Sequence, residues 1–270
     1  MEEVICSAKK RGRDLTIDSL KIAGKDPVRD AIIILPKDGK KKKDGLYQFS
    51  MSYRLGNNGY LSCKDFENYA YFNDKIVSKQ QGLSMGPNEF KVFTDKEVEL
   101  DIKDGTFLVR VDALSKVMED DETNNDVSTK LFFRGFMPNT PATPALHIEM
   151  LRIAGRTPVQ GRIKLTKQDA IGQKEGRYAF SVEYVMRNFG LADATEFDNL
   201  YFLDGKSFFR QPKLSIKAGD SQLVQLSAYL PPRSGKLTLK VDSGSKYAKS
   251  AQCKDTIELQ LMFQGFSQGQ

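Results

Sequence analysis

The sequence contains a single histidine, His147, and no tryptophan among its 270 residues. One histidine excludes most catalytic triads and zinc sites that depend on imidazole. The absence of tryptophan weakens the case for a sugar-binding platform. No apolar run approaches the ~18 residues that span a bilayer. We also find no nucleophile motif, phosphate-cradling glycine loop or paired-carboxylate cleft, and therefore expect a protein without catalytic activity of its own.

Cysteine is also scarce: Cys6, Cys63 and Cys253 form no C-x-x-C pair. A reduced compartment fits this pattern best, with a reactive thiol at Cys6 as the alternative. The segment Met1–Cys6 has acids where a secretory signal has basic residues, and it lacks an apolar core. We therefore expect a cytoplasmic protein, export by a route other than the general secretory one, or the trimmed form of a surface protein.

The net charge of +6 is unevenly distributed. Residues 1–136 carry 23 basic and 23 acidic side chains, whereas residues 137–270 carry 18 and 12. Because the basic residues are interleaved with acids, this modest excess argues against nucleic-acid binding.

The most informative feature is an internal duplication. Leu20–Gly24 matches Leu151–Gly155 at an offset of 131, which holds to Lys75/Lys206 and becomes 130 from Gly105/Gly235 onward. One residue is lost in the middle, and the chain is two copies of one domain. We predict a basic tail over residues 1–13, domains over 14–136 and 146–270, and a spacer over 137–145 whose three prolines favour an extended, semi-rigid form.

Each copy has the alternation of a β-strand. Apolar or aromatic residues recur at every second position from Tyr47 to Leu55 and from Tyr178 to Met186, a period typical of half-buried strands. Further strands are predicted at 15–22, 31–35, 68–72, 107–111 and 127–133, with hairpin turns at Asn73-Asp74 and Asp204-Gly205. Roughly seven strands per copy, without helical stripes, predict an all-β protein of two tandem immunoglobulin-like antiparallel β-sandwich domains.

The first copy has a recognisable order of motifs. A Tyr-x-Phe-x-Met-x-Tyr strand runs into Asn57-Asn58-Gly59, Tyr71–Lys75 follows, and Glu119–Asp126 has the sequence EDDETNND. This order resembles the CARDB family, the cell-adhesion-related domain found in bacteria. The resemblance implies an immunoglobulin-like sandwich, usually repeated on surface proteins and without catalysis. The second copy departs from it at Ala248–Asp255, and both copies carry extra sequence, at 30–45 and 161–176.

The acidic loop, Glu119–Asp126, holds five carboxylates and two asparagines. Calcium takes six to eight oxygen ligands, so Glu119, Asp121, Glu122 and Asp126 are its candidate ligands, although the spacing is not that of an EF-hand. The alternative is that Thr123, Asn124 and Asn125 hydrogen-bond to the backbone and shape the turn into the last strand. We favour the turn, and expect no other cofactor.

A second charged feature is the lysine run Lys40, Lys41, Lys42 and Lys43, which the second copy replaces with Ile171–Lys174. The run could contact phosphate or an acidic partner, and its ordinary interpretation is a solvated loop tip.

Three further features favour structural roles. His147 corresponds to Thr16 and is expected at an outward strand position. Asp112 and Asp242, like Asn57-x-Gly59 and Asn188-x-Gly190, recur in both copies, which favours turn chemistry over catalysis.

These observations predict a structural or adhesion-type module that binds proteins, with free edge strands that could recruit a partner by strand addition. One alternative is a component of a phage-like particle or an injection apparatus. Another is a carbohydrate-binding accessory module, for which Tyr60, Tyr69 and Tyr71 could offer aromatic surface.

Overall fold

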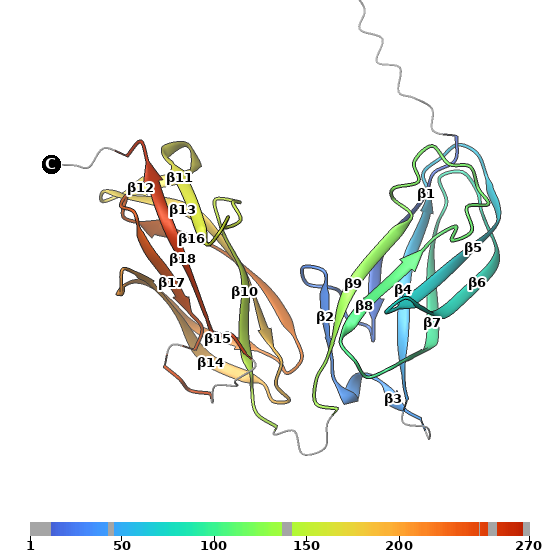
Figure 1. The fold of residues 1–270 in the computed structure, drawn as a ribbon, viewed down its shortest axis with the longest axis horizontal. Helices are drawn as coiled ribbons and strands as arrows, with labels where there is room; N and C mark the ends of the chain where they lie inside the picture. The colour runs from blue at the N-terminus through green and yellow to red at the C-terminus, as the bar shows by residue number, and fades with distance from the viewer. Residues whose placement is uncertain (1–11, 43–45, 137–141, 243, 248–252, 267–270) are drawn as a thin grey trace, which may run out of the picture. The chain divides into compact units, whose positions relative to one another are not determined.

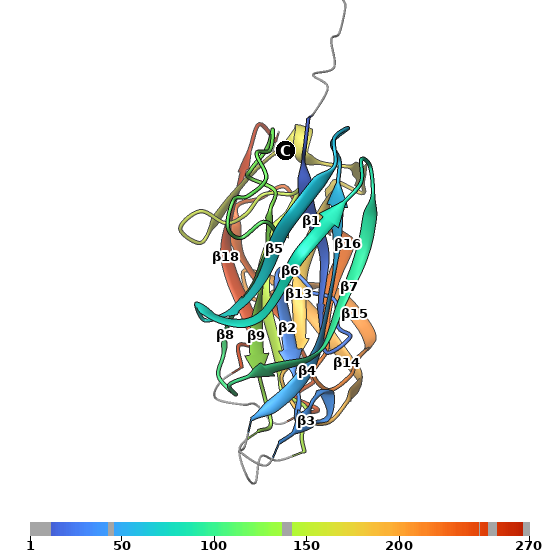
Figure 2. The ribbon, with the colours of Figure 1, turned by 90° about the vertical axis from the view of Figure 1, so that its right-hand side faces the viewer.

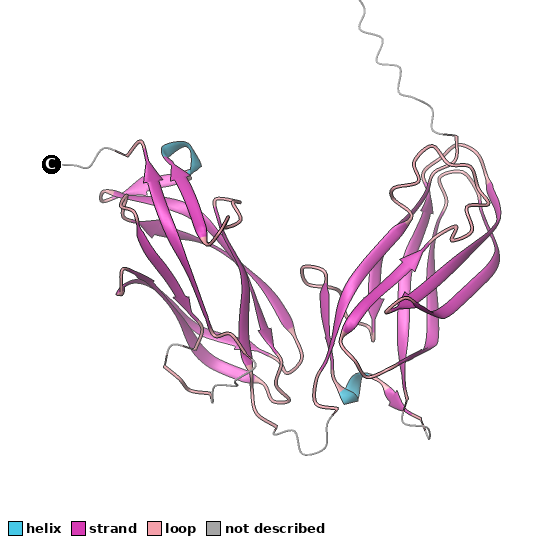
Figure 3. Cartoon of the chain, in the orientation of Figure 1, coloured by secondary structure: helices cyan, strands magenta, loops and turns pink. Residues whose placement is uncertain are grey.

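The computed structural model describes residues 12–42, 46–136, 142–242, 244–247 and 253–266. The chain divides into two compact units, Met1–Phe133 and Arg134–Gln270. Strands dominate both units, and the only helices in the described ranges are two short 3₁₀ turns, η1 (Pro36–Asp38) and η2 (Lys167–Asp169) (Figure 3). No helix among these residues is long and apolar enough to cross a membrane.

The first unit consists of two β-sheets (Figures 1 and 2). In one sheet, β4 (Tyr47–Asn57) pairs on one side with β1 (Leu15–Ile22) and β3 (Lys40–Lys41), and on the other with β7 (Phe90–Leu100). The other sheet has the order β2 (Ala31–Ile34), β9 (Asp126–Phe133), β8 (Gly105–Arg110), β5 (Cys63–Phe72) and β6 (Lys75–Met85).

The second unit repeats this topology strand for strand. In one sheet, β13 (Arg177–Asn188) pairs with β10 (Leu146–Ile153), β12 (Gly172–Lys174) and β16 (Ser221–Leu230). The other has the order β11 (Arg162–Thr166), β18 (Thr256–Gln264), β17 (Gly235–Lys240), β14 (Ala194–Leu203) and β15 (Lys206–Ile216).

The predicted fold class, an all-β protein of two immunoglobulin-like sandwiches, is confirmed. One pair in each unit departs from the antiparallel pattern, because β2 runs parallel to β9 and β11 runs parallel to β18. The extra sequence at 30–45 holds the predicted strand at 31–35, which is β2, together with η1 and β3, so it builds part of both sheets.

The period of two on β4 places every second side chain in the core. Phe49, Met51, Tyr53 and Leu55 are at most 2% exposed. The ring of Phe49 lies 5.8 Å from that of Phe133 on the opposite sheet. In the second unit Phe180 and Phe263 make the equivalent contact at 5.9 Å. These cross-sheet aromatic contacts close each sandwich.

A polar bridge also crosses each core. The Tyr53 hydroxyl on β4 donates to Gln80 Oε1 at 2.6 Å and accepts from Asn68 Nδ2 at 3.1 Å, both on the opposite sheet. Tyr184 makes the same two bonds with Gln211 at 2.6 Å and Asn199 at 2.7 Å. Buried polar groups need such partners, so the bridge fixes how the two sheets face each other.

The backbone also repeats between the units. Left-handed φ values occur at seven equivalent pairs of non-glycine residues: Ser19/Met150, Ala23/Ala154, Arg29/Gln160, Asp65/Glu196, Asn73/Asp204, Asp112/Asp242 and Ser115/Ser245. The predicted turns at Asn73-Asp74 and Asp204-Gly205 join β5 to β6 and β14 to β15, with positive φ at both central residues, as two-residue hairpins prefer.

The one-residue difference between the copies lies in β7. The register between β4 and β7 shifts between Phe49 and Met51, whereas the register between β13 and β16 is continuous. The first copy therefore carries its extra residue as a β-bulge on an edge strand, where bulges are common.

The Asn-x-Gly turns have the structural role expected from their repetition. Asn57 Oδ1 accepts from Gly59 N, and its amide donates to the carbonyls of Leu61 and Gly86. A Cβ on Gly59 would lie 2.7 Å from Arg13 Cα, because the segment before β1 passes directly against this glycine.

Part of the predicted spacer belongs to the second unit. The backbone N–H of Leu191 donates to Thr143 O and that of Phe189 donates to Ala145 O. Residues 137–141 lie outside the described ranges, as does most of the predicted tail 1–13.

We predict that Tyr53→Phe destabilises the first unit by about 1–3 kcal/mol, because it removes the hydroxyl that pairs with the buried Asn68 and the half-buried Gln80. Tyr184→Phe should do the same to the second unit only. Hydrogen exchange, read separately for each unit, measures both effects. Tyr60→Phe is the control, since Tyr60 is 62% exposed. Equal loss of protection in both units after one substitution would contradict independent cores.

Candidate functional site

A groove of about 560 Å³ lies at one end of the first unit. Arg13 comes from the segment before β1, whereas Leu61, Ser62 and Lys64 surround the start of β5. The turn after β8 contributes Lys116–Met118. We refer to these residues as the groove. Its lining combines three cationic side chains with apolar side chains.

The turn that carries Lys116 is held by Asp112. This residue has a left-handed φ of 45°, and its carboxylate accepts the backbone N–H of Lys116 at 3.0 Å and of Val117 at 2.7 Å. Asp242 accepts those of Lys246 and Tyr247 in the same way. The expectation that Asp112 and Asp242 serve turns is therefore confirmed.

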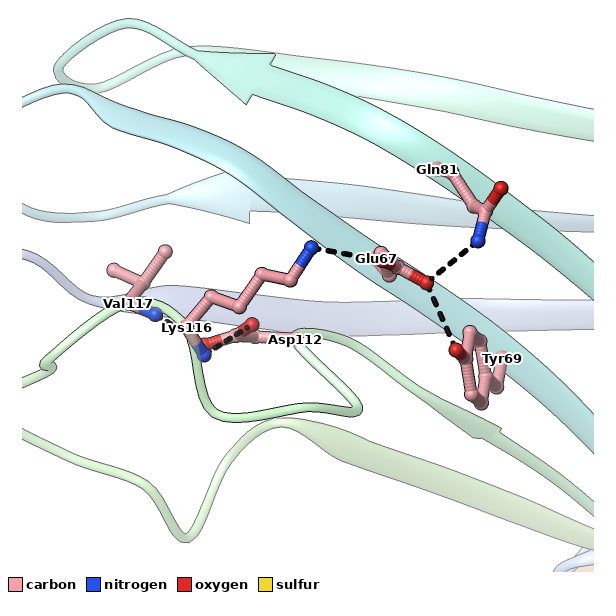
Figure 4. A network of polar contacts seen from close by, with 6 residues as sticks. All are labelled: Glu67, Tyr69, Gln81, Asp112, Lys116 and Val117. Carbon is pink, nitrogen blue, oxygen red and sulfur yellow. Dashed lines mark hydrogen bonds and ion pairs between the residues drawn. The ribbon is translucent and has the colours of Figure 1, made fainter.

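Behind the groove, Glu67 gathers three donors (Figure 4). Lys116 Nζ lies 2.8 Å from Oε1, and Oε2 accepts from the Tyr69 hydroxyl at 2.8 Å and Gln81 Nε2 at 3.0 Å. Glu67 is 6% exposed, and the hydrogen bond from Lys116, followed by those from Gln81 and Tyr69, lowers its pKa to about 2. The carboxylate therefore stays charged and holds the Lys116 ammonium at the groove.

The other two cations differ in their partners. Arg13 Nε donates to Ser62 O at 3.0 Å, which places the guanidinium against the β5 side of the groove. Lys64 is exposed and has no ion pair among the described residues. Leu61 and Met118 are 52% and 86% exposed. Glu67 offsets the charge of Lys116, on which Asp65 also acts, so Lys64 and Arg13 supply the positive charge of the groove beside exposed apolar side chains.

The acidic loop fastens the incoming chain next to this groove. The backbone N–H of Gly12 donates to the Asp120 carboxylate and that of Leu15 to Glu119, while Asp120 N donates to Arg13 O at 3.0 Å. Burial of Glu119 raises its pKa to about 7, despite the hydrogen bonds from Leu15 and Asn125. The loop thus positions Arg13.

The four predicted calcium ligands are directed to different partners. Asp126 forms a two-bond ion pair with Arg110 at 2.6 and 2.8 Å, and Asp121 accepts from Thr123. Only Glu119 and Glu122 converge, on Asn125 Nδ2 at 3.0 and 3.2 Å. In the described ranges no group of three or more His, Cys, Asp or Glu side chains is arranged to hold a metal ion.

The lysine run lies at the opposite end of the unit from the acidic loop. Lys40 and Lys41 form β3 and pair with Gln48 and Tyr47, so they are strand residues rather than a loop tip. Lys42 pairs with Glu99, and Lys43 lies outside the described residues. The start of β1 pairs nine residues further along β4, about 30 Å away at ~3.3 Å per residue. The two predicted charged sites are therefore separate.

The outward strand position expected of His147 is confirmed, because it alternates with the buried Leu146 and Ile148 on β10. The side chain is nevertheless half-buried: its Nδ1 accepts the backbone N–H of Lys254 at 2.9 Å, and burial lowers its pKa. The aromatic surface proposed from the sequence needs correction. Tyr69 is 8% exposed and bonded to Glu67, so it cannot join Tyr60 and Tyr71 in an aromatic binding surface.

The second unit has different residues at the equivalent positions. Ala192 stands for Leu61, Thr195 for Lys64 and Pro144 for Arg13. The Tyr247 hydroxyl accepts from Thr195 N at 2.6 Å and donates to Thr195 O at 2.7 Å. The sequence analysis did not single out Lys64, Lys116 or Glu67, although the Lys64/Thr195 difference was a usable signal.

No protein-family model and no curated protein matches this sequence. Among solved structures it is similar to the CARDB domain of a Pyrococcus furiosus protein, in complex with di-metal ions (19% identity, 45% of this chain, 94% of that one, TM-score 0.35). It is also similar to fibronectin(III)-like modules of Clostridium thermocellum CbhA (8%, 93%, 94%, 0.25). A Bacteroides uniformis beta-glucuronidase matches over 32% of its own length (12% identity, 93% of this chain, 0.30). These similarities concern the fold alone.

We predict that Glu119 makes the first unit less stable as the pH rises from about 4.3 to 7. Its pKa in the folded unit is about 7, whereas an unfolded glutamate has a pKa of ~4.3, so the folded state binds more protons in this window. Glu119→Gln should remove that part of the slope in urea unfolding measured from pH 4 to pH 8. The exposed Asp101→Asn is the control. An unchanged slope in Glu119→Gln would show that the carboxyl has the same pKa in the folded and unfolded states.

We also predict no calcium binding by Glu119, Asp121, Glu122 and Asp126, because Asp126 and Asp121 are engaged elsewhere. Isothermal titration and thermal melting at millimolar calcium, the weak end of protein sites, test this. A saturable heat that Asp121→Asn abolishes would restore the calcium hypothesis.

Proposed function

We propose that this protein is a non-enzymatic protein-binding module, and that a partner strand adds to the free edge of β7 in the first unit. The observation that carries the proposal is the exposed apolar surface on that edge: Phe90 is 51% and Val92 is 70% exposed. Exposed apolar residues on an unpaired strand favour association with another chain.

The other sheet edges of the first unit are less suited to pairing. The strand β2 has only four residues, and β6 is interrupted at Gly82, which has a φ of +64°. At β1, Ile17 N already donates to Asn124 O at 3.4 Å. The strand β7 has its bulge between Asp95 and Val98, but its first half pairs with β4 in continuous register from Phe90 to Asp95, and no strand among the described residues pairs with the other side of β7. Short, bulged or covered edges resist strand addition.

The second unit supports this assignment by contrast. In the first unit the ring of Phe90 covers Gly56, and the Arg54 guanidinium lies 5.3 Å from its centroid. At the equivalent positions Arg187 replaces Gly56 and Ser221 replaces Phe90. Arg187 is 1% exposed and donates to Ser221 Oγ at 2.6 Å and Glu149 Oε1 at 2.7 Å. A polar network thus stands where the first unit presents a phenyl ring.

The biological setting of such a module depends on its partner. An adhesion-type role at a bacterial surface and a role in a phage-like particle or injection apparatus both need a protein-binding edge. The lysine run Lys40–Lys43 remains a second candidate contact, and its described residues, Lys40–Lys42, lie at the far end of the unit. The buried Tyr69 argues against the carbohydrate-binding alternative.

We predict that Phe90→Ser and Val92→Lys each weaken partner binding by at least about tenfold, since exposed apolar anchors often dominate interfaces. The full chain would capture partners from the source cells, and calorimetry would measure the affinity of the purified partner. The matched control is Leu223→Lys, because Leu223 is the β16 counterpart of Val92 and is 36% exposed. Equal affinities for wild type and both β7 variants would exclude this edge.

A further inference from the structure

We propose that the groove of the first unit binds an acidic peptide segment. A carboxylate would contact Lys64 and Arg13, and an adjacent apolar side chain would pack on Leu61 and Met118. The proposal rests on the proposed function only in taking a protein as the partner. The groove proposal uses side chains that β7 does not contribute, so either proposal can be wrong while the other is right.

The charge of the groove favours a carboxylate. Lys116 is already matched by Glu67, whose lowered pKa keeps that pair ionised. Lys64 has no such partner among the described residues, and the Arg13 guanidinium donates to the backbone carbonyl of Ser62. Guanidinium and ammonium groups form their stronger hydrogen bonds with ionised oxygens, so an incoming carboxylate satisfies both.

The size and rim of the groove favour a peptide side chain beside that carboxylate. Its volume of about 560 Å³ is in the range of pockets that enclose ligands, ~300–1,000 Å³. Met118 and Leu61 are among the most exposed apolar side chains of the unit. Covering them with an apolar residue contributes binding free energy that a bare anion cannot provide.

The neighbouring acidic loop argues against a polyanion. Asp120 and Glu122 are exposed, and Asp120 contacts the same segment that carries Arg13. Duplex DNA carries a charge every ~1.7 Å, so a strand laid along the groove would bring phosphates against these carboxylates. One or two carboxylates on a peptide avoid that repulsion.

The two units supply substitutions that test the groove without new strain. Ala192 and Thr195 occupy the positions of Leu61 and Lys64 in a unit with the same backbone. Lys64→Thr and Leu61→Ala therefore give the groove the residues that the second unit has at these two positions. Lys130→Thr removes another exposed lysine charge, on β9 and outside the groove, and serves as the matched control.

The probe is a fluorescein-labelled peptide with alternating glutamate and leucine, titrated with the full chain and followed by anisotropy. Lys64→Thr and Leu61→Ala should each weaken binding by about three- to fivefold, and together by about tenfold, as expected of partly exposed contacts. Lys130→Thr should leave the affinity unchanged. A peptide with glutamine in place of glutamate should bind at least about tenfold more weakly.

Three results would overturn the proposal: no saturable binding of the acidic peptide, an equal loss in Lys130→Thr, or tighter binding of a single-stranded oligonucleotide than of the peptide. Loss of the natural partner in Phe90→Ser with retained peptide binding would keep both proposals. If the peptide does not bind but the β7 variants still lose the natural partner, the groove proposal is wrong and the β7 proposal stands.

Discussion

The hydrogen-bonded bridge from Tyr53 to Asn68 and Gln80 is the constraint on which the first unit depends. Apolar packing alone tolerates sliding of one sheet over the other, because dispersion and burial are non-directional. A buried hydroxyl with two partners on the opposite sheet does not tolerate it, since a shift leaves buried polar atoms unpaired. The same atoms form the bridge from Tyr184, so both copies retain this constraint. With the sheets fixed, the start of β5 and the Asp112 turn meet the segment before β1, and the groove follows.

The duplication lets the molecule act as its own control. What the units share is what the fold requires: the bridge, the cross-sheet phenylalanines and the Asp112 and Asp242 turns. Where the units differ, each has side chains of different chemistry on the same backbone. In the first unit the ring of Phe90 covers Gly56. At the equivalent place in the second unit, Arg187 donates to Ser221. At another equivalent place, the first unit has Lys64 beside Leu61 and the second has Thr195 under the Tyr247 hydroxyl. Because both sets of side chains accompany the same backbone, stability does not explain the exposed apolar and basic residues of the first unit.

Sequence alone predicts the strands whose alternation is apolar, such as Tyr47–Asn57, since burial of one face imposes a period of two. It misses β6 and β7, because edge strands bury few side chains: only Met85 at the end of β6 is buried in that strand. It also places Lys40–Lys43 in a loop, since the pairing of Lys40 with Gln48 depends on a hairpin without an apolar signal. The groove escapes prediction because its residues come from segments about 50 residues apart, which only the closed sandwich brings together.

The positions of the basic and acidic side chains in the first unit determine how the groove attracts anions. Residues 1–136 carry no net charge, yet Lys64 and Arg13 stand beside the acidic loop. Beyond a Debye length of ~8 Å at physiological salt, neighbouring opposite charges largely cancel, so they steer distant ions weakly. At contact they do not cancel, because a bound carboxylate lies nearer to Lys64 than to the loop. Such a surface discriminates by close fit rather than by long-range attraction, which favours specificity over association rate. Burial of Glu119, which raises its pKa to about 7, extends this balance. A rise in pH past neutrality adds a negative charge beside Leu15, and thereby makes the surroundings of the groove less attractive to anions.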